Sequence, residues 1–206
     1  VQDLSSLPLT SRGDLDAAPG RFGLDDTAAI SDIALTSGTT GEAVVVPYTA
    51  HDLYRLAFNE AVNFFNVGVK REDSVLLTVT LDRCFIAGMA YYSGVTQLGA
   101  AAIRSGPGQP ARQWQIIEKL TPRVIVGVPT FLKEVGRWGI NNGVDVARGS
   151  VDTIVTIGEP ARKPDYSPTA LGKELEDRGG ERLFSPKGGT EFEPACGESA
   201  EGPGGH

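Results

Sequence analysis

The chain has 206 residues and carries 19 Lys and Arg against 26 Asp and Glu, a formal net charge of −7 at pH 7. Its length suits one good-sized domain or a piece of a larger protein, and its apolar share of 40% is ordinary for a globular fold. The acidic excess argues against binding to nucleic acid or to an anionic membrane surface, because both need clustered Lys and Arg.

Two further features favour a soluble protein of the cytoplasm. No apolar run approaches the roughly 20 residues that a membrane helix needs, and Val1–Leu9 lacks the charged-then-apolar order of a signal peptide. Cys84 and Cys196 are the only cysteines, too few for a disulfide framework. We therefore expect no membrane partner and a reducing compartment.

The first part of the chain predicts an arm, a hairpin and a helix. Residues 1–30 are polar, contain several Pro and Gly and show no sustained period, so we expect an irregular N-terminal arm. In Ser31–Pro47, two strand-like runs flank a loop of small residues, which is the pattern of a β-hairpin. Thr49, three residues before Asp52, predicts the start of a helix, and Gly68 suits its end.

From there, short apolar runs alternate with helical patterns. Buried parallel strands are predicted at Ser74–Thr80, Ala100–Ile103, Val124–Val128 and Thr153–Ile157. Helices are predicted at Arg112–Leu120, Thr130–Trp138 and Leu171–Asp177. Such alternation predicts an α/β fold, a mostly parallel sheet with helices on both faces, beside the β-hairpin. We assign residues 31–185 to this core and expect residues 186–206, rich in Gly, Glu and Ser, to form a loop segment.

The sharpest chemical feature is Thr36–Gly41, the run Thr-Ser-Gly-Thr-Thr-Gly in the turn of the expected hairpin. Glycines let backbone N–H groups converge on one point, which attracts anions and phosphate above all, and the four hydroxyls add donors. The same composition is typical of turns, so a polar hairpin loop is the alternative. Glu42 follows Gly41, so the run lacks the Gly-Lys-Ser/Thr ending of a Walker loop.

Two other segments carry weaker signals. Gly158-Glu159-Pro160 follows the expected strand Thr153–Ile157, and ligands of open α/β sheets bind beyond the carboxyl ends of strands. Gly188–Glu191 joins a glycine pair to the hydroxyl of Thr190 and to a carboxylate, a hard oxygen ligand suited to Mg²⁺. For this second segment a surface loop is the alternative.

In combination, these segments resemble the AMP-forming acyl- and aryl-coenzyme A ligases, and more specifically their phenylacetate–coenzyme A ligase branch. The likeness begins with Thr36–Gly41 and with Val46–Leu53 behind it. It extends in order through Leu7–Leu15, Ile86–Gly94, Gly127–Leu132, Gly158–Pro160 and Gly189–Glu191, and so spans nearly the whole chain. The resemblance implies the large N-terminal domain of adenylate-forming enzymes, in part.

The resemblance also implies a role for each matching residue. The loop that grips the β- and γ-phosphates of ATP is matched by Thr36, Ser37, Gly38, Thr39, Thr40 and Gly41. The segment beside the adenine is matched by Gly158, Glu159 and Pro160. The catalytic pair that follows Gly189 is matched by Thr190, near the α-phosphate, and by Glu191, which holds Mg²⁺.

Family members join a carboxylic acid to AMP, release pyrophosphate and pass the acyl group to the thiol of coenzyme A. The resemblance therefore implies a ligase that takes ATP with Mg²⁺, a small carboxylic acid and coenzyme A. An anionic carboxylate must approach an anionic phosphate, so cations and backbone donors neutralise charge and no side-chain nucleophile is needed. Relatives often pair, which leaves a homodimer open.

A hydrophobic acid would need an apolar pocket near this site. Candidate wall residues are Phe85, Ala87, Met89, Tyr91 and Tyr92. For each of them, ordinary core packing beside the sheet is the alternative.

The sequence also departs from the family. Lys187, in Pro186–Gly189, stands where the family has an aromatic residue that can stack on adenine, and Glu42 and Ala43 stand where a lysine often follows the loop. The family's ribose-binding aspartate, hinge and mobile C-terminal domain with its catalytic lysine would lie beyond His206. We therefore expect a fragment, a truncated product or part of a longer chain. A non-catalytic or decayed nucleotide-binding module is the alternative function, and an unrelated α/β protein would require the colinear matches to be chance.

Cys196 and His206 lie where some relatives carry a cysteine-and-histidine zinc site. Two ligands alone cannot close a tetrahedral Zn²⁺ site, so further ligands would have to come from elsewhere. An incidental loop thiol is the alternative for Cys196.

Overall fold

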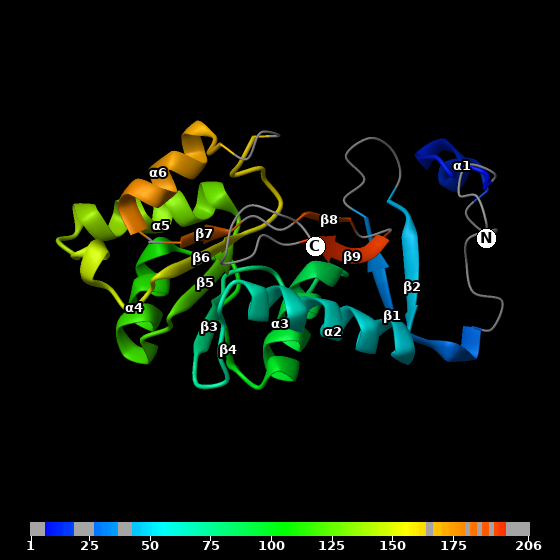
Figure 1. Cartoon of the computed structure of the whole chain (residues 1–206), viewed down its shortest axis with the longest axis horizontal. Helices are drawn as coiled ribbons and strands as arrows, with labels where there is room; N and C mark the ends of the chain where they lie inside the picture. Colours follow the sequence, from blue (N-terminus) through cyan, green and yellow to red (C-terminus); the bar gives the residue numbers. More distant parts are fainter. Residues whose placement is uncertain are drawn as a thin grey trace.

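The computed structural model describes residues 7–18, 27–36, 43–163, 167–179, 182–184, 187–189 and 192–196. A five-stranded parallel sheet forms its centre (Figure 1). In chain order its strands are β3 (Ser74–Leu77), β4 (Ala101–Arg104), β5 (Val124–Gly127), β6 (Thr153–Thr156) and β7 (Arg182–Phe184). Their order across the sheet is β4-β3-β5-β6-β7, so the chain crosses back over β3 after β4.

Helices cover both faces of this sheet, which confirms the α/β class predicted from the alternating pattern. The helices are α2 (Ala50–Asn66) and α3 (Ile86–Leu98) on one face, and α4 (Pro110–Leu120), α5 (Pro129–Asn141) and α6 (Ala170–Gly179) on the other. Successive strand residues point to opposite faces. Val75 and Leu77 therefore join the core under α2 and α3, whereas Leu76 joins the core under α4, α5 and α6.

A separate antiparallel hairpin lies at the other end of the molecule from α4, α5 and α6 (Figure 1). It consists of β1 (Ile30–Leu35) and β2 (Val45–Thr49). Ala34 and Tyr48 of the hairpin are buried with Ile86 of α3, so the hairpin is held against the helical layer. The helix α2 begins at the predicted cap, because the Thr49 hydroxyl accepts a hydrogen bond from the Asp52 N–H (3.2 Å) and the Asp52 carboxylate accepts one from the Thr49 N–H (2.9 Å).

The ends of the chain contain more regular structure than we predicted. The N-terminal arm, which we predicted to be irregular, includes the short helix α1 (Arg12–Ala17) and a 3-10 turn at Thr27–Ala29. Within residues 186–206, the prediction of a loop is wrong for β8 (Lys187–Gly189) and β9 (Phe192–Cys196), which pair antiparallel. Backbone pairing between neighbours in sequence overrides the weak strand propensity of glycine here.

The helix α3 went unpredicted, because its sequence shows no helical period. Its buried residues include Ile86 and Ala90, which face the hairpin, and Tyr91 and Val95, which face the sheet. A helix that is covered on more than one side is apolar nearly all round, so the one-sided pattern that marks a surface helix is missing. Among the described helices, none combines the length and the apolar character needed to cross a membrane.

An arginine joins the amino ends of three neighbouring strands. Arg123, directly before β5, donates one hydrogen bond to the Asp73 carboxylate (2.7 Å) and another to the Asp152 carboxylate (3.0 Å). Asp73 precedes β3 and Asp152 precedes β6. A third bond, to the Gly68 carbonyl (2.7 Å), reaches the end of α2. Charge-assisted bonds of this kind fix the strand starts and leave the opposite edge of the sheet for ligands.

A carboxyl group is buried where α2 crosses α3. The helices touch at Gly94, where an added Cβ would lie 2.4 Å from the Cβ of Glu60, so only glycine permits this approach. Glu60 is 4% exposed, and its carboxylate accepts a hydrogen bond from the Asn63 amide (3.4 Å). Burial raises the pKa of Glu60 to about 7, and the Asn63 bond offsets only part of that rise.

We predict that Glu60 makes the fold less stable as the pH rises from about 5 to 8. In that window the unfolded chain has lost the Glu60 proton and the folded chain still holds it, so the free energy of unfolding falls until the folded pKa of about 7 is passed. Glu60→Gln should therefore be more stable than the wild type at pH 8, by about 3 kcal/mol, and nearly equal to it below about pH 4. Urea denaturation across this range measures the difference. The exposed Glu72→Gln is the control, and a Glu60→Gln effect that does not change with pH would contradict the prediction.

Candidate functional site

The carboxyl edge of the sheet offers one topological switch point. β3 and β5 are neighbours, yet β3 continues into α3 on one face and β5 into α5 on the other. Chain segments that leave adjacent strands for opposite faces open a crevice, which is where open α/β sheets bind ligands. The sequence pointed to the end of β6, and the strand order moves the expected crevice to the ends of β3 and β5.

The hydroxyl-rich loop is closed at its base by the first of its predicted residues. The Thr36 N–H donates to the Val44 carbonyl (3.0 Å), and the Thr36 hydroxyl oxygen accepts from the Val44 N–H (2.9 Å). Thr36 is 8% exposed, so its side chain serves the hairpin rather than the surface. Ser37, Gly38, Thr39, Thr40 and Gly41 lie outside the described residues.

One backbone hydrogen bond joins this hairpin to the crevice. The Leu35 N–H, one residue before Thr36, donates to the carbonyl of Cys84 (3.0 Å) in the connection between β3 and α3. Arg83 and Cys84 both adopt left-handed backbone conformations, with φ of 58° and 56°. Such conformations cost non-glycine residues of order 1–3 kcal/mol each and concentrate at functional sites. The connection is therefore held in an unfavourable shape directly beside the base of the loop.

The segment after β6 is bound to the start of α5. The Glu159 carboxylate accepts a hydrogen bond from the Thr130 N–H (3.1 Å) and another from the Thr130 hydroxyl. Thr130 is the second residue of α5, so the carboxylate satisfies a free helical N–H and faces the positive end of the helix dipole. Gly158 before it has φ of 80°, a conformation that favours glycine. Gly158, Glu159 and Pro160 thus lie at the carboxyl edge of the sheet, beside the start of α5.

The predicted pocket residues divide into two groups. Tyr91 belongs to the core, with its ring edge-on to Phe64 (centroids 5.9 Å apart); burial, followed by the charge of Glu60, raises its pKa and keeps the phenol neutral. Ala87 and Tyr92 also pack against that core. Phe85 and Met89 remain 38% and 37% exposed, one helical turn apart at the start of α3.

The remaining candidate residues stay as predictions. Thr190, Glu191 and His206 lie outside the described residues, and Gly189 and Cys196 are described only through the backbone of β8 and β9. The residues that the structure does describe contain no group of three or more His, Cys, Asp or Glu able to hold a metal ion.

Sequence reasoning missed the connection between β3 and α3, which supplies the contact to the hairpin. The run Thr80–Phe85 contains no glycine, so nothing in its composition signalled the left-handed pair. The position of this run, directly after a strand that was predicted, is the one signal that could have identified it.

Comparisons with known proteins identify relatives of this chain. A model of the AMP-binding enzyme family matches residues 10–192. The phenylacetate-coenzyme A ligase of Pseudomonas putida is 29% identical over 147 residues, which cover 68% of this chain and 33% of that protein. The phenylacetate-coenzyme A ligase of Escherichia coli strain K12 is 28% identical over 180 residues, 86% of this chain and 40% of that protein. The chain therefore spans well under half the length of these curated relatives.

Solved structures share the fold. The 2-hydroxyisobutyryl-CoA ligase in complex with 2-HIB-AMP and CoA matches with a TM-score of 0.81 at 17% identity, over 95% of this chain and 42% of that one. The O-succinylbenzoate coenzyme A synthetase from Bacillus subtilis in complex with AMP matches with a TM-score of 0.64 at 22% identity, over 85% of this chain and 41% of that one. At such identities the likeness shows the architecture, which confirms the predicted fold.

We predict that Glu159 stabilises the fold as the cap of α5. Glu159→Ala removes the acceptor of the Thr130 N–H and hydroxyl, and should lower the free energy of unfolding by about 1 kcal/mol. Urea denaturation at pH 7 measures this loss. Glu134→Ala, at an exposed position within α5, is the matched control and should change stability by less than about 0.5 kcal/mol. If the two changes lowered the free energy of unfolding equally, the hydrogen bonds between Glu159 and Thr130 would not stabilise the fold.

Proposed function

This chain belongs to the AMP-binding enzyme family, and from that premise we propose that it carries the ATP-binding part of a ligase. The ligase would activate a carboxylic acid as an acyl-adenylate and then transfer the acyl group to coenzyme A. The recognition made from Thr36–Gly41 and the colinear segments is confirmed at the level of the family, with phenylacetate–coenzyme A ligases among the curated relatives at modest identity.

The observation that carries the proposal is the position of Thr36, the residue at the base of the hydroxyl-rich run. Thr36 follows Leu35, whose N–H is bonded to Cys84 in the connection that leaves β3 at the switch point. A loop anchored there would bring the hydroxyls and N–H groups of Ser37–Gly41 to the crevice, where the β- and γ-phosphates of ATP need donors.

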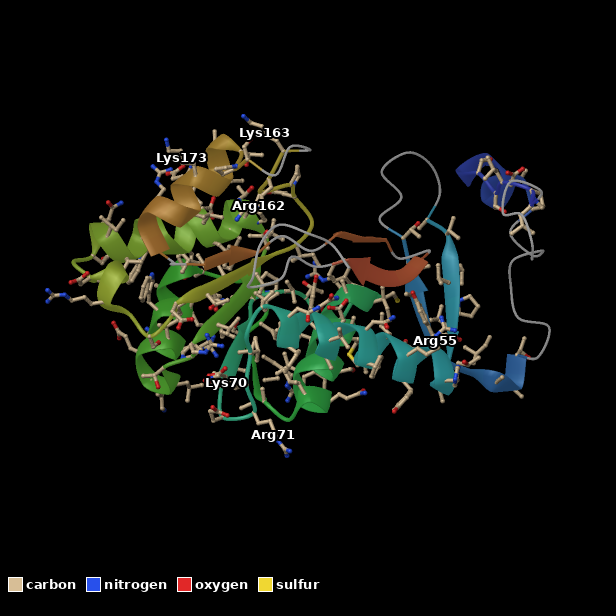
Figure 2. The ribbon with its side chains drawn as sticks, in the orientation of Figure 1. Arg55, Lys70, Arg71, Arg162, Lys163 and Lys173 are labelled. Carbon is tan, nitrogen blue, oxygen red and sulfur yellow. The ribbon has the colours of Figure 1, made fainter. Side chains whose placement is uncertain are left out.

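Positive charge near the same edge supports an anionic cofactor. Figure 2 shows Arg162 and Lys163 in the passage from β6 to α6, and Lys173 in the first half of α6. The Thr169 N–H donates to the Ala161 carbonyl (2.9 Å), which joins this passage to the start of α6. In a chain with a net charge of −7, cations here would raise the local concentration of ATP or of the phosphate-bearing end of coenzyme A.

The reaction depends on charge neutralisation and positioning. Thr190 and Glu191 are proposed to act at the α-phosphate, where a hydroxyl and a hard carboxylate are a donor set that suits Mg²⁺. The bound Mg²⁺ would supply neutralisation of the phosphate charge while the acid attacks. The loop residues would hold the departing pyrophosphate, so the chain itself provides orientation and hydrogen bonds rather than a nucleophile.

The acid is proposed to be an aryl or short acyl acid. Phe85 and Met89 are the most exposed of the predicted wall residues, and they lie at the start of α3, next to the Cys84 carbonyl that binds the hairpin. An apolar wall there favours a hydrocarbon group and disfavours a second charge on the acid. A non-catalytic nucleotide-binding module is the second candidate function, and Lys187 in β8 favours it, since an ammonium cannot stack on adenine as a ring would.

We predict that this chain binds ATP with Mg²⁺ through the loop and the carboxylate together. Calorimetry should give a micromolar-to-millimolar dissociation constant, and Thr40→Ala and Glu191→Gln should each weaken binding about tenfold or more. The loss of a hydrogen bond to a charged group is worth this much. Thr96→Ala, at the far end of α3, is the control and should bind as the wild type does.

Binding that neither variant weakens, in folded samples, would contradict the proposed site. Exchange of labelled pyrophosphate into ATP in the presence of aryl acids then separates the two functions. Binding accompanied by exchange supports the ligase, whereas binding without exchange, in a protein that also carries the family's C-terminal domain, supports the non-catalytic module.

A further inference from the structure

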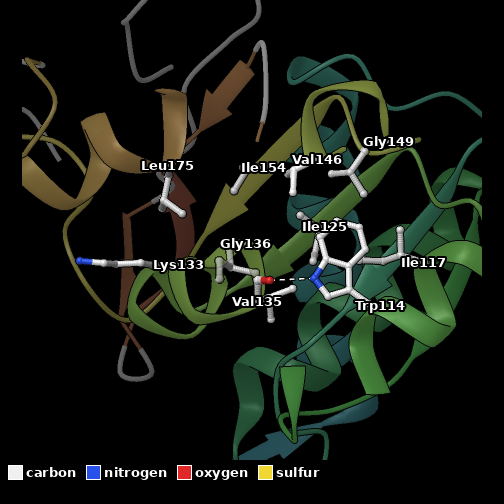
Figure 3. Close-up of a pocket in the computed structure, with 12 residues that line it drawn as sticks. Trp114, Ile117, Ile125, Lys133, Val135, Gly136, Val146, Gly149, Ile154 and Leu175 are labelled. Atoms are coloured by element: carbon white, nitrogen blue, oxygen red, sulfur yellow. Dashed lines mark hydrogen bonds between the residues drawn. The ribbon is translucent and has the colours of Figure 1, made fainter. Parts of the chain in front are cut away.

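An apolar cavity lies on the face of the sheet opposite α2, α3 and the hairpin (Figure 3). Its volume is about 60 Å³, and it lies between the sheet and the helices α4, α5 and α6. Its apolar wall consists of Trp114, Ile117, Ile125, Leu132, Val135, Val146, Val151, Ile154 and Leu175. No residue of the proposed nucleotide site is part of this wall.

The two polar side chains of the wall, Trp114 and Lys133, already have partners. The indole N–H of Trp114 donates to the Val135 carbonyl (2.7 Å), so the ring presents only its apolar surface to the cavity. The Lys133 ammonium is bound to the Glu174 carboxylate (2.6 Å), and Figure 3 shows it directed away from Trp114. The lysine therefore lines the cavity with its hydrocarbon stem.

Water is a poor occupant of such a space. A volume of about 60 Å³ has room for roughly four waters at 10–15 Å³ each. A buried water needs two to four polar partners, and this wall supplies few. An apolar group that displaces weakly held water gains affinity, so the space favours an apolar occupant.

Two glycines of α5 differ in what they do for the cavity. A Cβ on Gly139 would lie 2.6 Å from the Trp114 ring, so packing requires glycine there. A Cβ on Gly136, which lines the cavity, would meet no atom within 4 Å. Glycine destabilises a helix interior relative to alanine. At position 136 no close contact requires a residue without a side chain. The effect of glycine there is to keep the cavity open.

We propose that this cavity is a binding site for a small neutral apolar molecule, the size of a short alkyl chain or a single aryl ring. The cavity has less than half of the roughly 150 Å³ of a closed cavity that holds benzene, so a ring would enter it only in part. A charged ligand is disfavoured, since the ammonium of Lys133 is already paired and a carboxylate would lose its hydration inside. This site goes beyond the proposed ligase activity and does not depend on it.

Fluorobenzene is the probe, observed by ¹⁹F relaxation as the protein is titrated. Saturable binding is expected in the wild type, and Gly136→Ala should weaken it about tenfold, because the added methyl occupies the cavity. The same variant should raise the thermal midpoint, which shows that it folds. Gln115→Ala, at an exposed position of α4, is the matched control and should bind fluorobenzene as the wild type does.

A second measurement needs no cavity-filling variant. In Trp138→Phe, Trp114 is the sole tryptophan, and its fluorescence should change with fluorobenzene along the same saturation curve. Binding that does not saturate, or that Gly136→Ala leaves unchanged, would overturn the assignment of the cavity. Competition by 4-fluorobenzoate stronger than by fluorobenzene would overturn its neutral ligand class. Thr40→Ala should leave fluorobenzene binding unchanged. The fluorobenzene and ATP binding assays therefore test the cavity and the nucleotide site independently.

Discussion

The rest of the structure depends on burial of both faces of the parallel sheet. Val75, Leu77, Val124 and Val126 face one core and Leu76 and Ile125 the other, so neither face can be left to solvent. Two sets of helices are therefore needed, and the chain must change face between β3 and β5. That change of face opens the crevice, which means that the position of the candidate site follows from the demand for burial before any functional side chain is considered.

Two contacts hold the hairpin against the helical layer and against the connection that follows β3. The hairpin's core contact through Ala34 and Tyr48 places it against α2 and α3, and the bond from Leu35 to Cys84 sets its distance from the sheet. The left-handed pair Arg83 and Cys84 carries backbone strain at that same contact. This strain lowers the free energy of unfolding, and it lies at the contact that holds the base of the hydroxyl-rich loop at the edge where phosphates would bind.

Two charged groups, the partly exposed Arg123 and the buried Glu60, are held in different ways. Arg123 is fully engaged, with two carboxylates and a carbonyl around it, and it joins the starts of three strands away from the ligand edge. Glu60 instead sits in the tight crossing of α2 and α3, and its pKa rises toward neutrality because desolvation outweighs its one bond to Asn63. The first arrangement stabilises the sheet at neutral pH, and the second makes the helix crossing sensitive to pH.

Much was determined by the sequence alone, because it depends on neighbours along the chain. Strand and helix periods, the capping box of Thr49 and Asp52 and the ordered family segments are local signals, and the structure and the family match confirm them. Other features arise from contacts between distant residues. The helix α3 was not predicted because it is covered on several sides. Glu159 caps α5 because the fold brings its carboxylate to Thr130. Tyr91 is buried in the core and is no longer a candidate for the pocket wall, whereas Phe85 and Met89 are exposed and remain candidates. Local patterns record which residues avoid water, but only the tertiary structure decides which distant residues meet.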